Sequence, residues 1–267
     1  MQNATEKILK VAESAARQAG DIIINKKGSS SFSEKGDNNL VTEADYAAQE
    51  TIIKIISEQY PDHSFIAEEN DLTANINEPD LWVIDPLDGT NNYAHQIPHF
   101  SVSIAYARFG QVKAGVVFDP ERGELFSAAE SMGTTLNGKK ITVSRALSLQ
   151  EAIVATGFYY DRGVMMRKTL SSIEKLFAEN IHGIRRFGSA ALDLCWVACG
   201  RFDAYFEYKL AVWDFAAGLL IVNEAGGNCT DQQGNPLTLS SSGIVVSNSI
   251  LHRELLNIVG WDRDNLL

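Results

Sequence analysis

The stretch "WVIDPLDGTNN" at residues 82–92 joins an apolar run to two closely spaced carboxylates. The run at 82–84 is typical of a buried strand, because aromatic and β-branched side chains favour a pleated, half-buried surface. Asp85 and Asp88 follow directly, and two like charges at such short spacing repel each other. The segment therefore predicts either a type I turn with Pro86 at its second position or a pair of ligands for a cation.

Three further acids stand where a predicted element begins or ends. Glu68 follows the apolar run in "SFIAEEN", Asp45 lies near a helix start in "VTEADY", and Asp214 lies in the first turn of the helix at "VWDFAAG". Each has an ordinary interpretation when taken singly. An aspartate at a helix start is commonly a cap, and the Glu68-Glu69 pair is typical of a solvated loop.

Together these acids fit the chemistry of a divalent cation. Mg²⁺ prefers oxygen ligands, and an Asp-x-x-Asp sequence at a strand end can serve two metal ions about 4 Å apart. Residues 89–91 (Gly-Thr-Asn) offer backbone N–H groups where a helix can begin, which suits a phosphate. A bound metal inverts the local charge, so an acidic site of this kind can bind an anionic ester.

A haloacid-dehalogenase type of phosphatase is the rival interpretation of acids near Gly-Thr. That class carries Asp-x-Asp near its N-terminus, where the first aspartate is a nucleophile. In this chain the spacing is Asp-x-x-Asp and the first acid is residue 85. We therefore reject that interpretation.

Composition limits the partners of the chain. It has 267 residues, with 23 Lys and Arg against 34 Asp and Glu, for a net charge of −11. This balance disfavours nucleic acid and anionic membranes as partners. The N-terminal segment has no apolar run of the signal-peptide type, and no stretch is apolar over 18 residues, which predicts a cytoplasmic protein that does not cross a membrane. Cys195, Cys199 and Cys229 have no ligand pattern and are expected to be free thiols.

Hydrophobic periodicity predicts an α/β chain without repeats. Adjacent apolar runs without an intervening helix favour antiparallel pairing. The polar segment 28–39 is expected to be a mobile loop. The turn at 137–140 predicts a seam within a single domain, 1–267, between subdomains 1–145 and 146–267. Helices are expected near 4–27, 42–61, 163–179, 189–199, 213–225 and 249–259, and strands near 64–67, 81–84, 100–107, 114–118, 125–129, 152–156, 202–207 and 243–247.

Five ordered blocks extend over nearly the whole chain and resemble the inositol monophosphatase family of Mg²⁺-dependent, lithium-sensitive phosphatases. The resemblance implies an α/β (α+β) fold, a five-layered αβαβα sandwich with largely antiparallel or mixed sheets. It also implies a homodimer that hydrolyses phosphomonoesters by direct attack of water. The blocks are "LVTEAD" (40–45), "FIAEE" (65–69), "WVIDPLDGTNNYAHQIPHFSVSIA" (82–105), "HGIRRFGSAALDLCWVACGRFDAYFE" (182–207) and "VWDFAAGLLIVNEAGG" (212–227).

The resemblance also implies roles for individual residues. Two to three Mg²⁺ ions per subunit would be held by Glu68, Asp85, the Leu87 carbonyl, Asp88 and Asp214. Glu68 and the Thr90 hydroxyl would position the attacking water, Asp45 would support Thr90, and the Gly89 and Thr90 amides would bind phosphate. Lys35 matches a family lysine near the active site, and a solvated charge on a flexible loop is the alternative interpretation. His95 and His99 are not expected to act as general acids.

The substrate implied is a small phosphorylated polyol or sugar, with inositol-1-phosphate first. Fructose 1,6-bisphosphate, 3′-phosphoadenosine 5′-phosphate, histidinol phosphate and NADP are the alternatives within the family. A non-enzymatic role as a protein- or RNA-associated regulatory factor is the alternative outside catalysis. Substrate contacts are expected from Asp88, Gly188, Ser189, Ala190, Glu207 and Asp214. A basic rim that either binds a second phosphate or pairs with surface acids is expected from Arg162, Arg167, Lys168, Arg185 and Arg186.

Overall fold

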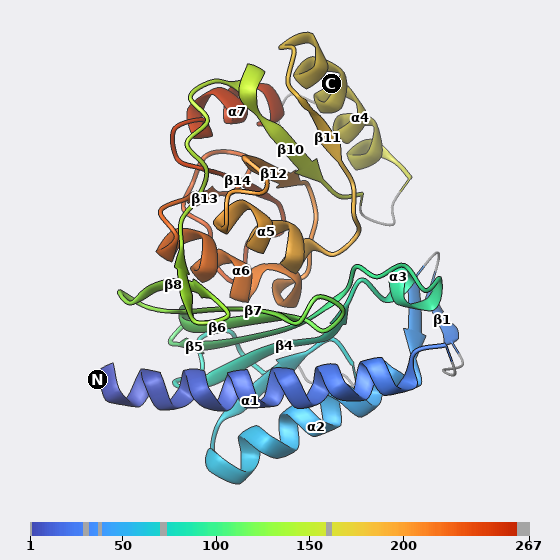
Figure 1. The fold of residues 1–267 in the computed structure, drawn as a ribbon, viewed down its shortest axis with the longest axis vertical. Coiled ribbons are helices and arrows are strands. Elements are labelled where there is room, and N and C mark those ends of the chain that lie inside the picture. Colours follow the sequence, from blue (N-terminus) through green and yellow to red (C-terminus); the bar gives the residue numbers. More distant parts are fainter. Residues whose placement is uncertain (1, 29–31, 37–38, 70–73, 159–161, 261–267) are drawn as a thin grey trace.

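Two β-sheets alternate with three layers of helices (Figure 1). From one face of the molecule to the other, the order is helix, sheet, helix, sheet, helix. This confirms the predicted α/β class and the five-layered sandwich. The structure is a computed structural model, and the residues it describes are 2–28, 32–36, 39–69, 74–158 and 162–260.

The first layer consists of helices α1 (Gln2–Lys26) and α2 (Glu43–Gln59). Both bury a stripe of alanine and isoleucine side chains against one face of the larger sheet. The start of α2 is set by Thr42, whose hydroxyl accepts a hydrogen bond from the Ala44 N–H at 3.1 Å. The helix ends just before Pro61, which cannot continue it.

The larger sheet has seven strands in sequence order, β3 to β9. Strands β3 and β4 are parallel and every other neighbouring pair is antiparallel, as expected from runs without intervening helices. Its strands are β3 (Ser64–Ala67), β4 (Leu81–Asp88), β5 (Ser101–Arg108), β6 (Gln111–Asp119), β7 (Glu124–Ala129), β8 (Gly133–Leu136) and β9 (Lys139–Ile141).

Strand β4 does not stop at residue 84, and the turn interpretation of the two acids that follow is wrong. Asp85 pairs with Ser103 and Asp88 pairs with Ser101, so β4 advances by three residues while β5 advances by two. The extra residue is a β-bulge. Side chains three apart on a regular strand point to opposite faces, and the bulge restores both aspartates to the same face as the two serines. Pro86, which has no N–H, lies in this interruption of the ladder.

The central layer holds helices α5 (Ala190–Ala198) and α6 (Val212–Glu224) between the two sheets. Both are apolar on almost every side, because a helix covered on two faces has no broad solvent side. Helix α6 approaches β6 closely at Gly115, where a Cβ atom would lie 2.8 Å from the Ala217 carbonyl oxygen. This contact brings the start of α6 close to the end of β4.

The smaller sheet has the order β11-β10-β12-β14-β13. Strand β10 is parallel to β11 and β12, and the remaining pairs are antiparallel, so the sheet is mixed. Helices α4 (Val164–Ala178) and α7 (His252–Val259) cover its outer face, preceded by a 3₁₀ turn at Leu149–Glu151. The strands are β10 (Ile153–Thr156), β11 (Gly183–Arg185), β12 (Ala204–Glu207), β13 (Asn228–Thr230) and β14 (Ile244–Ser247).

The polar segment at 28–39 is not simply a loop, which corrects the expectation. Strands β1 (Phe32–Gly36) and β2 (Asn39–Thr42) pair antiparallel as a separate two-stranded sheet that leads directly into α2. Lys35 lies in β1, and its side chain is outside the described part of the structure. The proposed subdomain boundary at residue 145 stays a prediction. No helix in the described ranges combines the length and apolar character needed to span a membrane.

Candidate metal centre and active site

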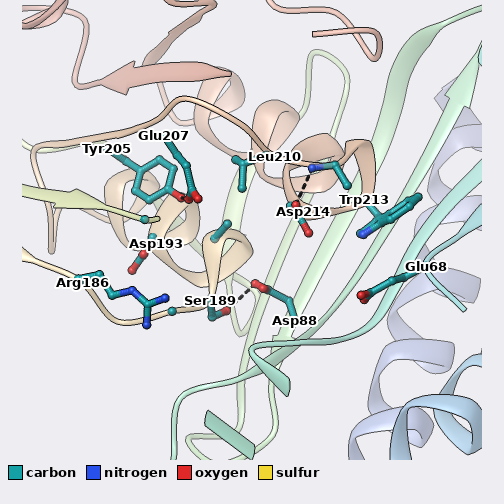
Figure 2. A pocket seen from close by; sticks show the side chains of 14 residues that line it. Glu68, Asp88, Arg186, Ser189, Asp193, Tyr205, Glu207, Leu210, Trp213 and Asp214 are labelled. Carbon is teal, nitrogen blue, oxygen red and sulfur yellow. Dashed lines mark hydrogen bonds between the residues drawn. The ribbon is translucent and has the colours of Figure 1, made fainter. Parts of the chain in front are cut away.

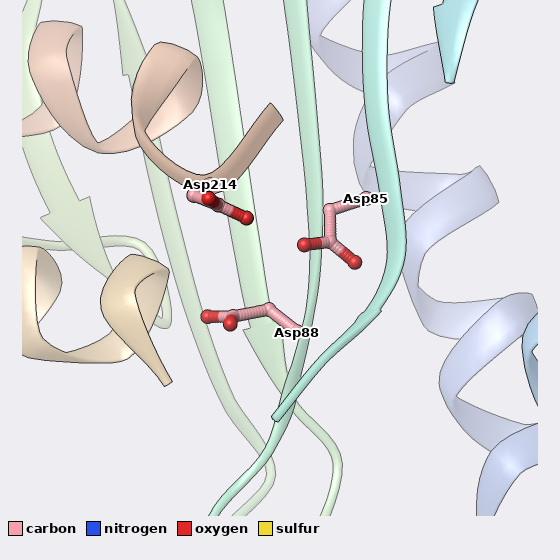
Figure 3. Close-up of side chains that lie close together, drawn as sticks. All are labelled: Asp85, Asp88 and Asp214. Carbon is pink, nitrogen blue, oxygen red and sulfur yellow. The ribbon is translucent and has the colours of Figure 1, made fainter. Parts of the chain in front are cut away.

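Three aspartates from two distant segments converge beside strand β4 (Figure 3). Asp85 and Asp88 come from β4, on the face selected by its bulge, and Asp214 comes from the first turn of α6. One carboxylate oxygen of each lies within 4.8 Å of the other two. The predicted cluster is therefore present in the geometry, and it depends on the packing of α6 against the larger sheet.

Two of these carboxylates are held through one oxygen each. Asp85 Oδ1 accepts the Leu87 N–H at 3.0 Å, and Asp214 Oδ2 accepts the Ala211 N–H at 2.7 Å. The second bond is the helix cap that the sequence suggested as an alternative role for Asp214. Because a carboxylate has two oxygens, capping and metal binding are compatible in the same side chain.

Asp88 is held from the far side of the cavity by the start of α5. Its Oδ2 accepts hydrogen bonds from the Ser189 hydroxyl at 2.6 Å and the Ala191 N–H at 2.8 Å. The Ser189 hydroxyl also accepts the Leu192 N–H at 3.4 Å as the N-cap of α5. Ser189 is therefore the N-cap of α5 and also a donor to Asp88, and its predicted contact with substrate stays a prediction.

The electrostatics of this cluster favour a cation. Burial raises the pKa of Asp85 well above its ordinary value, and the charges of Glu68, Asp88 and Asp214 raise it further. Burial also raises the pKa of Asp88 to about 6. Neighbouring carboxylates that resist ionisation are stabilised in the charged form by a divalent cation. The donors are all hard oxygens, so the site fits Mg²⁺ rather than a soft metal.

Thr90 stands at the edge of the cluster with two acceptors behind it. Its Oγ1 lies 3.1 Å from Asp45 Oδ1 and 2.9 Å from the Leu87 carbonyl oxygen, and its single proton can serve one of them at a time. The other oxygen of Asp45 accepts the Thr42 N–H and hydroxyl at 2.8 and 2.6 Å. Asp45 therefore stabilises the start of α2 and also orients Thr90. Burial raises the pKa of Asp45 to about 6.

Gly89 lets the chain leave β4 and begin the short helix α3 (Thr90–Ala94). Its φ of 95° lies in the left-handed region, and a Cβ atom there would lie 3.0 Å from the His99 carbonyl oxygen. Both the backbone conformation and the lack of space require glycine. The N–H groups of Gly89 and Thr90 follow Asp88 directly in the chain, and their role as phosphate donors stays a prediction.

A cavity of about 200 Å³ extends from the acid cluster along the start of α5 (Figure 2). Glu68, Asp88 and Asp214 line one end of it, beside the acid cluster. All the residues predicted to contact substrate line this one cavity, including Gly188, Ser189, Ala190 and Glu207. The far end is lined by side chains that are polar or charged, namely Arg186, Asp193, Tyr205 and Glu207.

Glu207 is fitted tightly into that far end. The Tyr205 hydroxyl donates a hydrogen bond to its Oε2 at 2.5 Å, and burial raises the pKa of Glu207 to about 7. A Cβ atom on Gly157 would lie 1.9 Å from the same oxygen, so the absence of a side chain there makes room for the carboxylate. The predicted hydroxyl-binding residue thus has a defined orientation.

Sequence reasoning missed part of this wall. Asp193 is 1% exposed, one of its oxygens has no hydrogen-bond partner among the described residues, and burial raises its pKa well above the ordinary value. Its position inside the apolar helix "ALDLCWVA" was a usable signal, because an acid there is costly unless it has a purpose. Of the predicted basic rim, Arg186 lines the cavity, whereas Lys168 lies over the ring of Tyr208.

His99 is a core residue, in agreement with its exclusion as a general acid. Its ring lies 5.0 Å from that of Phe187 and 5.2 Å from that of Trp196. Neither ring nitrogen has a hydrogen-bond partner among the described residues. Burial, with a smaller effect of the Arg122 charge, lowers the pKa of His99 to about 4.

This burial predicts that His99 makes the fold sensitive to acid. Above pH 6.5 the imidazole is neutral in the folded and in the unfolded chain. Between pH 6.5 and 4 only the unfolded chain takes up the proton, so His99 lowers the free energy of unfolding by about 1.4 kcal/mol per pH unit. His99→Phe should flatten this dependence in urea unfolding measured from pH 7 to 4, with exposed His182→Gln as the control. An unchanged slope in His99→Phe would show that another group causes the sensitivity.

Comparison with known proteins identifies close relatives. The model of the inositol monophosphatase family matches residues 4–260. The inositol-1-monophosphatase of Synechocystis is 44% identical over 252 residues, covering 92% of this chain and 86% of the relative. The Nus factor SuhB of Escherichia coli is 41% identical, covering 93% and 94%. The solved structure of the Thermotoga maritima IMPase superposes with a TM-score of 0.86 at 36% identity, covering 97% of both chains.

Proposed function

The chain belongs to the inositol monophosphatase family, and on this premise we propose that it is a Mg²⁺-dependent phosphomonoesterase that hydrolyses inositol-1-phosphate or a similar polyol phosphate. The observation that carries the proposal is the approach of Asp85, Asp88 and Asp214 to within 4.8 Å of one another at the end of a cavity. Carboxylates at this spacing repel one another when ionised, and a bound cation would offset that repulsion.

The residues that would hold two to three Mg²⁺ ions are Glu68, Asp85, Asp88, Asp214 and the Leu87 carbonyl. When bound, Mg²⁺ would supply Lewis-acid stabilisation of phosphate oxygens and would lower the pKa of a coordinated water. In the protein, the three aspartates are already oriented by N–H and O–H donors to one oxygen each. Little reorganisation is then needed when the site is loaded.

The remaining catalytic work falls to groups beside the cluster. The Thr90 hydroxyl can donate its proton in a hydrogen bond to Asp45 while its oxygen accepts a hydrogen bond from an attacking water, which would orient that water toward the phosphorus. The Gly89 and Thr90 N–H groups are the proposed donors to phosphate oxygens. With water activated in this way, no side-chain nucleophile is required, and we expect no phospho-enzyme.

The cavity lining supports an uncharged leaving group. Among the described residues, five carboxylates line it, from Glu68, Asp88, Asp193, Glu207 and Asp214, against one cationic side chain, Arg186. Carboxylates accept hydrogen bonds from hydroxyl groups and repel a second phosphate. We therefore rank a polyol monophosphate ahead of fructose 1,6-bisphosphate and NADP. The presence of Arg186 is the observation that keeps a bisphosphate as the second candidate.

A second role is suggested by the relatives named Nus factor SuhB. A regulatory role through protein partners is compatible with phosphatase activity. The homodimer that the family resemblance implies is compatible with either role, and we retain it as a proposal. Binding of a partner that persists in a variant without phosphatase activity would separate the two roles.

The proposal is tested by release of inorganic phosphate from a panel of esters with purified protein. The panel is inositol-1-phosphate, fructose 1,6-bisphosphate, 3′-phosphoadenosine 5′-phosphate, histidinol phosphate and NADP. We expect activity that requires Mg²⁺, disappears with a chelator, is inhibited by lithium and is highest on inositol-1-phosphate. Well-folded protein that releases no phosphate from any of them in Mg²⁺ would contradict the proposal.

A further inference from the structure

Asn92 links two backbone segments that border the site. It lies in α3, two residues after Thr90, and is 7% exposed. Its side-chain amide donates hydrogen bonds to the His99 carbonyl oxygen at 2.8 Å and to the Phe187 carbonyl oxygen at 2.7 Å. One short side chain thus joins the segment before β5 to the segment before α5.

The second of these segments carries part of the cavity wall. We call residues 186–189 the substrate loop, because Arg186, Gly188 and Ser189 all line the cavity. Gly188 has a φ of 88°, and the Ser189 hydroxyl reaches Asp88. The placement of this loop therefore affects both the far end of the cavity and a proposed metal ligand.

Phe187 anchors the substrate loop at two points. Its ring centroid lies 5.0 Å from that of His99, 5.5 Å from that of Trp196 and 5.9 Å from that of Phe202. Its carbonyl oxygen is held by Asn92. Aromatic contacts are tolerant of small shifts, whereas a hydrogen bond of 2.7 Å specifies the position of the carbonyl group and hence of the next peptide.

Three backbone segments pack closely around Asn92, and little space separates them. A Cβ atom on Gly89 would lie 3.0 Å from the His99 carbonyl oxygen and 3.2 Å from that of Gly188. A Cβ atom on Gly188 would lie 3.3 Å from Asn92 Nδ2. The carbonyl oxygens of His99 and Phe187 both accept hydrogen bonds from Asn92 Nδ2, and these two donors offset the repulsion between the two oxygens.

We propose that Asn92 is a positioning residue for substrate selection, which sets the substrate loop against the metal-binding end of β4. This inference rests on the proposed phosphatase function and adds to it. Thr90 acts on the phosphate side of α3, while Asn92 acts on the leaving-group side. Hydrolysis of an ester whose leaving group carries hydroxyls requires contacts with the substrate loop. Hydrolysis of an aryl ester without such hydroxyls requires mainly the acid cluster and the phosphate donors.

The test compares two substrates, inositol-1-phosphate and p-nitrophenyl phosphate, in Asn92→Asp. This variant keeps the size of the side chain but places a carboxylate oxygen against a carbonyl oxygen. We expect kcat/KM for inositol-1-phosphate to fall by about 10- to 100-fold, because small misplacements of a contact are costly. We expect the ratio of the two kcat/KM values to fall at least about tenfold, with most of the change in KM for inositol-1-phosphate.

Asn248→Asp is the matched control. Asn248 is also a buried amide with two acceptors, the Ser144 hydroxyl at 3.1 Å and the Ala146 carbonyl at 3.0 Å, but it lines neither the metal cluster nor the cavity. It should lose thermal stability without a change in the substrate ratio. If Asn92→Asp does not fold, Asn92→Ser, which retains one donor, should show the same change in ratio to a smaller extent.

The outcomes separate this inference from the proposed function. Wild-type protein that hydrolyses neither ester would contradict the proposed hydrolysis of polyol phosphates, on which this inference rests. Active wild-type protein with Asn92 variants that lose both activities in equal proportion would overturn the positioning role and leave the phosphatase function intact. A lower ratio in the Asn92 variants, with an unchanged ratio in Asn248→Asp, supports the inference.

Discussion

Asp85→Asn should lower kcat for inositol-1-phosphate by about 10³-fold or more. The metal contribution to phosphoryl transfer is worth several kcal/mol, and each 1.36 kcal/mol corresponds to a factor of ten in rate. Asp85 is 1% exposed, and one of its carboxylate oxygens lies within 4.8 Å of an oxygen of each of the other two aspartates, so the loss of its charge would weaken the affinity of the whole cluster for a cation. Steady-state kinetics at saturating Mg²⁺ would measure the loss.

The same substitution should not weaken the metal-free fold. Asparagine keeps an oxygen that can accept the Leu87 N–H, and it removes a charge that burial and three acidic neighbours disfavour. The melting temperature without Mg²⁺ should therefore be unchanged or higher. Wild-type protein should gain about 3 kcal/mol at a Mg²⁺ concentration 100 times the Kd, and Asp85→Asn should gain much less.

The exposed Asp21→Asn is a suitable control for Asp85→Asn, because it removes the same charge on the outer surface of α1. It should retain both the activity and the stabilisation by Mg²⁺. If Asp85→Asn kept full activity and the full Mg²⁺-dependent shift in melting temperature, the acid cluster would not be the metal site.

The bulge in β4 shows where sequence reasoning reached its limit in the fold. An apolar run followed by Asp-Pro-Leu-Asp correctly predicted a buried strand leading to two cooperating acids. It did not show that the strand continues to Asp88, because a bulge depends on pairing with β5 and is invisible to local periodicity. Short strands such as β11 and β13 were missed for a related reason, since three residues carry too little pattern.

In the site, residues were predictable where chemistry demands a particular residue type. Glu68, Asp85, Asp88 and Asp214 stand out because carboxylates at element ends are costly without a partner, and the structure brings all four to one small pocket that shares Glu68, Asp88 and Asp214 with the cavity. Asn92 is different, because an asparagine in "GTNNY" is ordinary in a turn or short helix. Its contacts to His99 and Phe187 exist only after segments far apart in the chain have packed together.

Asp214→Asn and Asp214→Ala together should separate metal binding from helix capping. Both remove the charge, so both should lower kcat by about 10³-fold if Asp214 is a metal ligand. Asparagine retains an oxygen for the Ala211 N–H, whereas alanine does not. The alanine variant should therefore lose about 1 kcal/mol more stability, which corresponds to a melting temperature about 2–4 °C lower.

Both variants remove one negative charge from the cluster, so a difference between them reports only the hydrogen bond to Ala211. Thermal unfolding without Mg²⁺ measures the cap alone, and phosphate release with Mg²⁺ measures the ligand. Equal melting temperatures would show that the bond to Ala211 contributes nothing to α6. Near-normal activity in Asp214→Asn would remove Asp214 from the metal site and leave it as a cap, since a neutral amide is a poor ligand for Mg²⁺ beside two carboxylates.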